Sequence, residues 1–321
     1  MKIAVLGAGA FGTALAVALA RKHGRVGLWA RDSDHAQAMR RTGENLRRLP
    51  GVAMPSGVEV SADMDDVSDA DILLLAVPMQ QLSHLLAAHG ARFSGRNLVA
   101  CAKGIELTTG LGAMQILRDR CPDAVPAILT GPSFAADIAR GLPTALTLAC
   151  ADEAAGETMQ AALSTPVLRL YRTTDTVGAE LGGALKNVIA IAAGVVSGAG
   201  LGDSARAALI TRGFAEMSRF AAAQGAQAET LAGLAGLGDL ILTCTSTQSR
   251  NFRFGQAIGA GTGFDPSITV EGAATAKAVS TIAGSLQIDM PVANMVAALV
   301  DKKITVTDAI NTLLARPLRK E

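Results

Sequence analysis

The residue with the clearest chemical potential in this chain of 321 residues is Lys186, a single amine in the run of small and apolar residues from 179 to 200. At helical spacing its neighbours include Gly182, Ile189 and Ala193, so the surrounding helix face carries little side-chain bulk. A lysine in such a place is partly desolvated, which disfavours the ammonium and lowers the pKa toward neutrality. Lys186 is therefore a candidate general base, although a lysine whose stem packs on the helix while its ammonium reaches water has the same pattern.

Further polar groups follow in the same half of the chain. Asp239 comes directly after the glycine-rich run AGLAGLG, and the segment TSTQSRN ends with Ser249, Arg250 and Asn251. A carboxylate near an amine can orient it, and an arginine beside a serine and an asparagine can bind a phosphate. The alternatives are a helix cap for Asp239 and a solvated surface charge for Arg250.

Near the N-terminus, the sequence GAGAFG lies between a short apolar run and a helical pattern. In this setting Gly7 permits a tight turn, Gly9 lets a pyrophosphate approach the backbone, and Gly12 lets the helix pack closely on the strand. The amides of Ala10 and Phe11 open the helix, where the helix dipole attracts phosphate oxygens. The pattern predicts a dinucleotide-binding site.

The end of the next strand, RVGLWARD, bears on which dinucleotide binds. Arg31 can pair bidentately with a ribose 2′-phosphate, whereas a carboxylate in this neighbourhood usually binds the 2′-hydroxyl of NAD. Asp32 is such a carboxylate, but it or the serine after it can cap the following helix. The sequence therefore favours NADP over NAD, with a solvated surface arginine as the alternative for Arg31.

Two loops that follow later strands carry candidate ligand contacts. Lys103 ends the strand NLVACAKG, and Gly131 to Ser133 follow the strand AVPAILT. Ligands bind at the carboxyl ends of strands in an open α/β sheet, so Lys103 is expected to meet a phosphate or a substrate oxygen. A loop lysine in solvent and a serine that caps the next helix are the alternatives. The backbone of Ala135 is expected to face the same ligand.

Strands and helices alternate up to about Thr173, and only helical periods follow. This change predicts a dinucleotide-binding domain at 1–173 and an all-helical substrate and catalytic domain at 174–321. The fold class is α/β, with an N-terminal Rossmann-type, doubly wound, mostly parallel sheet and a second, all-α domain. Glu271 opens one of the last helices, where a carboxylate favours the helix dipole. Residues 43–61 form an extended excursion to which we assign no chemistry.

Composition excludes several classes of function. The formal net charge of +1 gives no electrostatic case for a nucleic acid or an anionic membrane. The four cysteines lack metal-ligand spacing and fit a reduced intracellular protein without a metal site. The N-terminus lacks a signal peptide, and the apolar stretch after Lys186 is shorter than the ~20 residues that span a bilayer. We expect a cytoplasmic protein without stable membrane insertion.

Seven segments of the chain form a recognisable set, in the order GAGAFGTALA, AKGIE, GPSFA, LGGALKNVIAIAAG, ARAALITRGFAEM, GLGDLILTCTSTQSRN and VEG. Together they resemble one family, the bacterial NAD(P)-dependent glycerol-3-phosphate dehydrogenases, over nearly the whole chain. The most specific pieces, LGGALKN and AGLGDL with QSRN, are absent from other dehydrogenases with a similar first domain. The resemblance implies reversible hydride transfer between sn-glycerol 3-phosphate and dihydroxyacetone phosphate, for glycerophospholipid synthesis, by a homodimer.

The same resemblance implies individual roles, with Lys186 as proton acceptor and Asp239 beside it. Many members of the family carry serine at the position of Ala10, and valine or isoleucine at that of Thr269, so this chain departs from the pattern at two cofactor contacts. The implied substrate contacts are Lys103, Gly131, Ser133, Lys186, Asp239, Ser249, Arg250 and Asn251. The implied cofactor contacts, besides the glycines, are Ala10, Phe11, Arg31, Lys103, Ala135, Arg250, Thr269 and Glu271.

Two other functions remain as alternatives. The β-hydroxyacid and 6-phosphogluconate type dehydrogenases also pair this kind of cofactor domain with a helical domain and a catalytic lysine, but they act on carboxylate substrates. A nicotinamide-binding sensor without catalysis has no need of a lysine that exchanges protons. Reduction of dihydroxyacetone phosphate, measured with both nicotinamide cofactors, distinguishes these possibilities.

Overall fold

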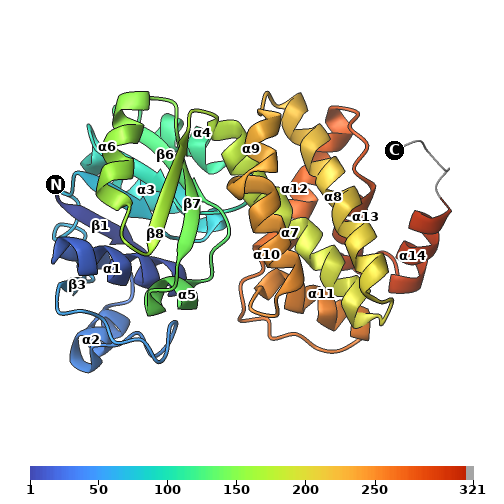
Figure 1. The fold of residues 1–321 in the computed structure, drawn as a ribbon, viewed down its shortest axis with the longest axis horizontal. Coiled ribbons are helices and arrows are strands. Elements are labelled where there is room, and N and C mark those ends of the chain that lie inside the picture. Colours follow the sequence, from blue (N-terminus) through green and yellow to red (C-terminus); the bar gives the residue numbers. More distant parts are fainter. Residues whose placement is uncertain (316–321) are drawn as a thin grey trace. The chain divides into compact units, whose positions relative to one another are not determined.

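A computed structural model describes residues 1–315 of the chain (Figure 1). It contains two compact units, of which the first comprises Met1–Lys103 and Leu111–Glu180. The second comprises Gly104–Gly110 and the chain from Leu181 onward. The sequence predicts a domain boundary after Thr173, where the last strand ends. In the structure the first unit continues seven residues further, to Glu180, which lies inside a helix.

The first unit is built on a sheet of eight strands in the order β3-β2-β1-β4-β5-β6-β7-β8. Every neighbouring pair is parallel except β6 with β7, which is antiparallel. The strand order reverses beside β1, as in doubly wound dinucleotide-binding folds, and this confirms the predicted fold class. The strands are β1 (Ile3–Leu6), β2 (Val26–Trp29), β3 (Val58–Ser61), β4 (Ile72–Leu75), β5 (Asn97–Ala100), β6 (Val125–Thr130), β7 (Thr144–Cys150) and β8 (Leu168–Thr173).

The apolar runs in the sequence form the central strands because both faces of the sheet are covered. All four residues of β1 and all four of β4 are buried, which is typical of parallel strands with helices on both sides. Asp32 and Asp152 cap two of these helices with their side chains. The helices of this unit are α1 (Ala10–His23), α2 (Ser33–Thr42), α3 (Met79–His89), the 3₁₀ helix η1 (Gly90–Phe93), α4 (Ala113–Arg120), α5 (Ala135–Arg140) and α6 (Glu153–Leu163).

All the regular elements in the described part of the second unit are helices, as the sequence predicts. Its main segment begins within α7 (Thr176–Gly198), whose first five residues belong to the first unit. One short element, η2, is a π-helix. The remaining elements are α8 (Asp203–Ala223), α9 (Ala228–Ala232), η2 (Leu234–Gly238), α10 (Asp239–Thr245), α11 (Arg250–Ala260), α12 (Glu271–Ser285), α13 (Pro291–Val300) and α14 (Val306–Leu314).

Helix α7 is the core of this unit. It begins ten residues before Lys186, so it is longer than the apolar stretch that the sequence suggested. By length and composition α7 could cross a membrane, but 89% of its apolar window is buried inside the protein. It packs backbone to backbone on α11, since a Cβ at Gly194 would lie 2.1 Å from the carbonyl oxygen of Phe252 and one at Gly255 would lie 2.0 Å from that of Ile191. Small residues in α7 therefore allow helix packing.

A buried carboxylate fixes the start of α13. Glu216, on α8, is 2% exposed and accepts hydrogen bonds from the backbone amides of Val292 and Ala293. These amides belong to the first turn of α13 and have no acceptor within their own helix. Burial raises the pKa of Glu216 from its ordinary 4.5 to about 7, against the opposing effect of the two amides.

This raised pKa predicts how stability depends on pH. The native state binds more protons than the unfolded state between pH 4.5 and about 7, so the contribution of Glu216 is present at low pH and is lost as the pH rises through this window. Between pH 5 and pH 8, the free energy of unfolding of the wild-type protein should fall by up to ~3 kcal/mol relative to that of Glu216→Gln. This corresponds to a fall of several degrees in Tm. Melting temperatures of both proteins across this range test the prediction, and parallel curves would contradict it.

Candidate active site

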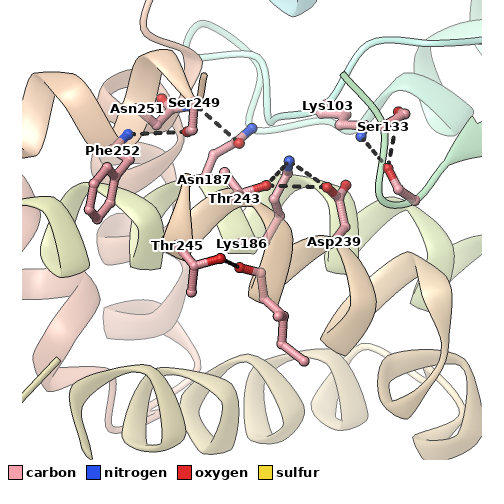
Figure 2. A network of polar contacts seen from close by, with 12 residues as sticks. Lys103, Ser133, Lys186, Asn187, Asp239, Thr243, Thr245, Ser249, Asn251 and Phe252 are labelled. Carbon is pink, nitrogen blue, oxygen red and sulfur yellow. Dashed lines mark hydrogen bonds and ion pairs between the residues drawn. The ribbon is translucent and has the colours of Figure 1, made fainter. Parts of the chain in front are cut away.

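Lys186 lies in the middle of α7, and its ammonium group contacts two side chains of the second unit. Its Nζ donates to Asp239 Oδ1 at 2.8 Å and to Thr243 Oγ1 at 2.7 Å, and Thr243 Oγ1 donates to Asp239 Oδ1 at 3.2 Å. Figure 2 shows these three side chains meeting at one point. Exposed fractions are 7% for Lys186, 1% for Asp239 and 4% for Thr243. The sequence alternative, an ammonium that reaches bulk water, is therefore wrong.

This arrangement decides which form of the amine is stable. Burial alone disfavours the charged lysine, but an opposite charge within hydrogen-bond distance favours it. A buried ammonium is tolerated only when it is paired and hydrogen-bonded, and Asp239 with Thr243 meets that requirement. The cluster thus holds Nζ at a defined place and orients it.

Gly182, four residues before Lys186, has a structural purpose. The π-helix η2 lies against α7, and a Cβ at Gly182 would be 2.5 Å from the carbonyl oxygen of Ala235. Asp239 follows η2 immediately, so this close approach brings its carboxylate to Lys186. The bulk-free face noted in the sequence is therefore occupied by the chain's own backbone, and π-helical turns are frequent at functional sites.

A second polar network neighbours the first on α7. Asn187, next to Lys186, accepts from Asn251 Nδ2 at 3.0 Å, and Asn251 Oδ1 accepts from the amide of Gly272 at 3.0 Å. Ser249 caps α11, because its Oγ accepts from the Phe252 amide at 3.2 Å. The expected substrate residues Ser249 and Asn251 are thus buried and already bonded within the unit.

Sequence reasoning missed two residues of these networks, Thr243 and Asn187. The spacing of Asp239 and Thr243 was a usable signal, since residues four apart on a helix share a face. Asn187 has no such signal, because its partner Asn251 is 64 residues away. Cys244 lies beside Thr243 but offers no nucleophile, since burial raises the pKa of its thiol to about 12.

The other expected residues of this unit lie near helix starts. Arg250 is exposed in the first turn of α11. Glu271 opens α12 and is partly buried, while Thr269 is exposed two residues earlier. Within residues 1–315, no group of three histidine, cysteine or acidic side chains is arranged to hold a metal ion.

In the first unit, the glycine-rich turn fits a pyrophosphate. Gly7 has φ of 117°, which disfavours any side chain there, and a Cβ at Gly12 would lie 2.0 Å from the carbonyl oxygen of Gly7. At Gly9, by contrast, an added Cβ would meet nothing within 4 Å, so space is open beside the turn. Helix α1 starts here without a side-chain cap or an acidic residue in its first turn, at Ala10 and Phe11. Uncapped amides at a helix N-terminus bind phosphate oxygens.

At the end of β2, the two candidate residues have different environments. Arg31 is exposed. Asp32 caps α2 by accepting from the amides of Asp34 and His35, and it pairs with Arg47 at 3.0 Å. These hydrogen bonds lower the pKa of Asp32, led by the one from His35, so it stays ionised in its capping role.

The loops after β5 and β6, also in the first unit, are joined by hydrogen bonds. Lys103 Nζ, beyond β5, donates to the carbonyl oxygen of Gly131, beyond β6, at 3.0 Å, and Ser133 Oγ donates to the same oxygen at 3.3 Å (Figure 2). Ser133 does not cap the next helix, because α5 begins at Ala135 with Phe134 at the capping position. The loops that the sequence selected thus converge at the carboxyl edge of the sheet.

The first unit has a doubly wound sheet with an open glycine-rich turn, and the second is a helical unit with a buried lysine. This combination is typical of nicotinamide-dependent dehydrogenases with a helical second domain. Comparison with known families identifies which dehydrogenase family this is. The family model for the NAD-dependent glycerol-3-phosphate dehydrogenase N-terminus matches residues 2–156, and that for the C-terminus of the same enzymes matches residues 175–311. The chain belongs to the NAD-dependent glycerol-3-phosphate dehydrogenase family.

Individual relatives are similar along their whole length. The glycerol-3-phosphate dehydrogenase [NAD(P)+] of Ruegeria sp. (strain TM1040) is 60% identical over 321 residues, which is all of both chains. The enzyme of the same name from Cereibacter sphaeroides is 62% identical, over 99% of this chain and all of its own. The crystal structure of glycerol-3-phosphate dehydrogenase from Coxiella burnetii, 35% identical, has a TM-score of 0.93 and covers 98% of this chain and 99% of its own.

The close contact between η2 and α7 yields a prediction. In Gly182→Ala the new methyl group would overlap the backbone at Ala235, so η2 must move. We expect the free energy of unfolding to fall by ~1–3 kcal/mol, as in other overpacked cores. Urea unfolding of the variant measures this loss.

Gly284→Ala is the matched control. This glycine also lies inside a helix, α12, but an added Cβ there would meet nothing within 4 Å. Its replacement should be neutral or stabilise by up to ~1 kcal/mol through helix propensity. Equal stability of Gly182→Ala and the wild-type protein would show that η2 does not depend on this contact.

Proposed function

We propose that this protein catalyses reversible hydride transfer between NAD(P)H and dihydroxyacetone phosphate to give sn-glycerol 3-phosphate, for glycerophospholipid biosynthesis. The buried cluster of Lys186, Asp239 and Thr243 is the observation that carries the proposal, because it provides a positioned proton within the segments most specific to the family. A non-catalytic sensor would not need it. The full-length similarity to glycerol-3-phosphate dehydrogenases disfavours an enzyme for carboxylate substrates.

The cofactor supplies or accepts the hydride when it is bound. We assign its pyrophosphate to the turn formed by Gly7, Gly9 and Gly12 and to the amides of Ala10 and Phe11, which open α1. The remaining proposed contacts are Arg31, Lys103, Ala135, Arg250, Thr269 and Glu271. An exposed Arg31 beside an Asp32 that is already used as a helix cap supports NADP over NAD.

Lys186 carries the proton in our proposal. In the reducing direction the carbonyl carbon of dihydroxyacetone phosphate gains the hydride, and its oxygen gains a proton from the Lys186 ammonium. The same positive charge stabilises negative charge that develops on that oxygen. In the oxidising direction the neutral amine takes the proton back. Asp239 and Thr243 orient Nζ, and Asp239 favours the ammonium, the form that reduction requires.

The substrate phosphate is assigned to the start of α11. Arg250, exposed in the first turn, offers a guanidinium that can bind a phosphate bidentately, and the N-terminus of the helix adds its dipole. Ser249 and Asn251 flank it, and their hydrogen bonds to Phe252 and Gly272 hold the turn in place. Lys103, Gly131 and Ser133 are the proposed substrate contacts of the first unit.

We further propose that the enzyme works in the cytoplasm as a homodimer. All four cysteines are buried free thiols, as expected in a reducing compartment. The apolar helix α7 is used inside the protein, which leaves no need for a lipid environment. Family likeness is the support for the dimer.

A single assay tests the function. Purified protein should oxidise NADPH when dihydroxyacetone phosphate is added, with a higher kcat/KM for NADPH than for NADH because of Arg31. Absorbance of the reduced cofactor follows the reaction, and 3-hydroxyacid substrates run in parallel serve as the comparison. Turnover of those acids without turnover of dihydroxyacetone phosphate would refute the proposal.

Removal of the amine should abolish chemistry but not cofactor binding. We expect Lys186→Ala to lower kcat by at least ~10²-fold, as does the loss of a general acid or base, while the Kd for NADPH stays nearly unchanged. Steady-state kinetics and fluorescence titration with NADPH give the two numbers. A comparable loss of cofactor affinity would contradict the assignment of Lys186.

Arg250→Ala should affect substrate binding more than turnover, in contrast to Lys186→Ala. Its main effect should be a raised KM for dihydroxyacetone phosphate, because the side chain binds a part of the substrate that does not react. An unchanged KM would remove Arg250 from the phosphate site.

A further inference from the structure

Glu180 is a partly exposed acidic residue with an enclosed carboxyl group, and the proposed mechanism does not use it. It lies on α7 in the first unit, and its Oε1 accepts from the amide of Met114 at 2.8 Å. The amide of Ala113 also donates to this carboxylate. Both amides belong to the first turn of α4, whose capping residue, Gly112, has no side chain to offer. A residue of α7 therefore caps α4.

The fit between Glu180 and α4 is close. A Cβ at Gly112 would lie 2.2 Å from Oε2 of Glu180 and 2.3 Å from its Cδ, so the carboxylate occupies the space that a side chain would need. Gly112 has φ of −83° and ψ of 170°, a conformation open to any residue. Glycine here leaves room for the carboxylate in its present position, and its backbone freedom is not used.

The place of Glu180 in the chain gives this contact its importance. Glu180 is the last residue of the first unit, Leu181 is the first residue of α7 that belongs to the second unit, and Lys186 follows six residues after Glu180 on the same helix. A second bond, from Arg118 of α4 to Thr176 Oγ1 at 3.5 Å, joins the same two helices. The N-terminal end of the lysine helix is therefore fastened to α4 just before the chain leaves the first unit.

We propose that Glu180 is a positioning residue, whose carboxylate on the N-terminus of α4 anchors the helix that carries Lys186. This inference rests on the proposed function for its kinetic consequence, but the anchor itself is defined within the first unit. Lys186 transfers a proton only if its helix is held in one place, since small displacements of a catalytic group reduce turnover steeply.

The electrostatics of the site make the anchor sensitive to pH. Part of Glu180 reaches the surface, but its carboxyl group is enclosed by protein, and this burial raises its pKa to about 7. The two amides and Arg118 oppose the shift. Asp175, the other acidic group at this end of α7, accepts from the amide of Gly178 at 2.7 Å. Glu180 is ionised above about pH 7 and bonds strongly to the helix N-terminus, whereas the protonated form bonds weakly.

Glu180→Gln, a neutral side chain of the same shape, tests the proposal. At pH 8.5 we expect its kcat for dihydroxyacetone phosphate to be about tenfold below that of the wild-type protein, with KM values within about twofold. At pH 6, where wild-type Glu180 is itself protonated, the ratio of the two kcat values should fall toward one. Because other titrating groups affect both proteins equally, a ratio that does not change with pH would overturn the proposal.

Glu216→Gln is the matched control, since Glu216 also caps a helix from outside and its pKa is raised to a similar value. It lies on α8 and has no bond to α7 among those described. We expect its kcat, and the pH dependence of its kcat, to match those of the wild-type protein. A pH-dependent loss as large as that of Glu180→Gln would mean that any buried carboxylate has this effect, and the proposal would fail.

Gly112→Ala disrupts the same contact between Glu180 and α4 without changing Glu180 itself. The added methyl group must displace the carboxylate, so kcat should fall as in Glu180→Gln, and the double variant should be no worse than either single one. Additive losses, or wild-type turnover in Gly112→Ala, would assign Glu180 a merely structural role. If Glu180→Gln does not fold, the kcat of Gly112→Ala still tests whether the contact between Glu180 and α4 affects turnover.

Amide hydrogen exchange separates the anchor from the activity. The amide of Met114 should exchange faster in both variants than in the wild-type protein at pH 8.5, and unchanged exchange would overturn the anchor directly. If the wild-type protein fails to reduce dihydroxyacetone phosphate, the proposed function falls, while this measurement still reports on the contact between α4 and α7.

Discussion

The second unit depends on a lysine that is buried together with a carboxylate. Removal of an ammonium from water costs several kcal/mol unless the group is paired and hydrogen-bonded. The residues around Lys186 must therefore supply a negative charge and hydrogen-bond acceptors. Asp239 supplies the charge and Thr243 an additional oxygen, both within 2.8 Å of Nζ. The same burial that makes the pair costly keeps it in one geometry, and the proton transfer that we propose for Lys186 requires such a fixed geometry.

Glycine is the means by which the fold meets these conditions. The π-helix before Asp239 reaches Lys186 only because Gly182 leaves room for its backbone, and α11 approaches α7 through Gly194 and Gly255. Each of these positions sacrifices helix propensity for close approach of two backbones. Precision at the site is thus obtained from the absence of side chains around one large, charged one.

Buried carboxylates recur where one helix must be fixed to another. Glu180 and Glu216 each accept two backbone amides from the start of a helix to which they do not belong. The helix dipole and the unbonded amides compensate for burial of the acid, but not completely, and both pKa values are raised to about 7. The positions of α4 and α13 therefore depend on groups that titrate near neutral pH.

The sequence by itself determined the sheet, the change to helices after Thr173, the glycine-rich turn and the choice of Lys186 with Asp239, because strand runs, helical periods and turn residues are local patterns. Only the tertiary structure decided that Asn187 bonds to Asn251, that the backbone of a π-helix packs against Gly182, and that Glu180 caps α4. Each of these joins residues more than 50 positions apart. Such contacts leave no periodic signal in one chain, since they exist only once separate helices have packed.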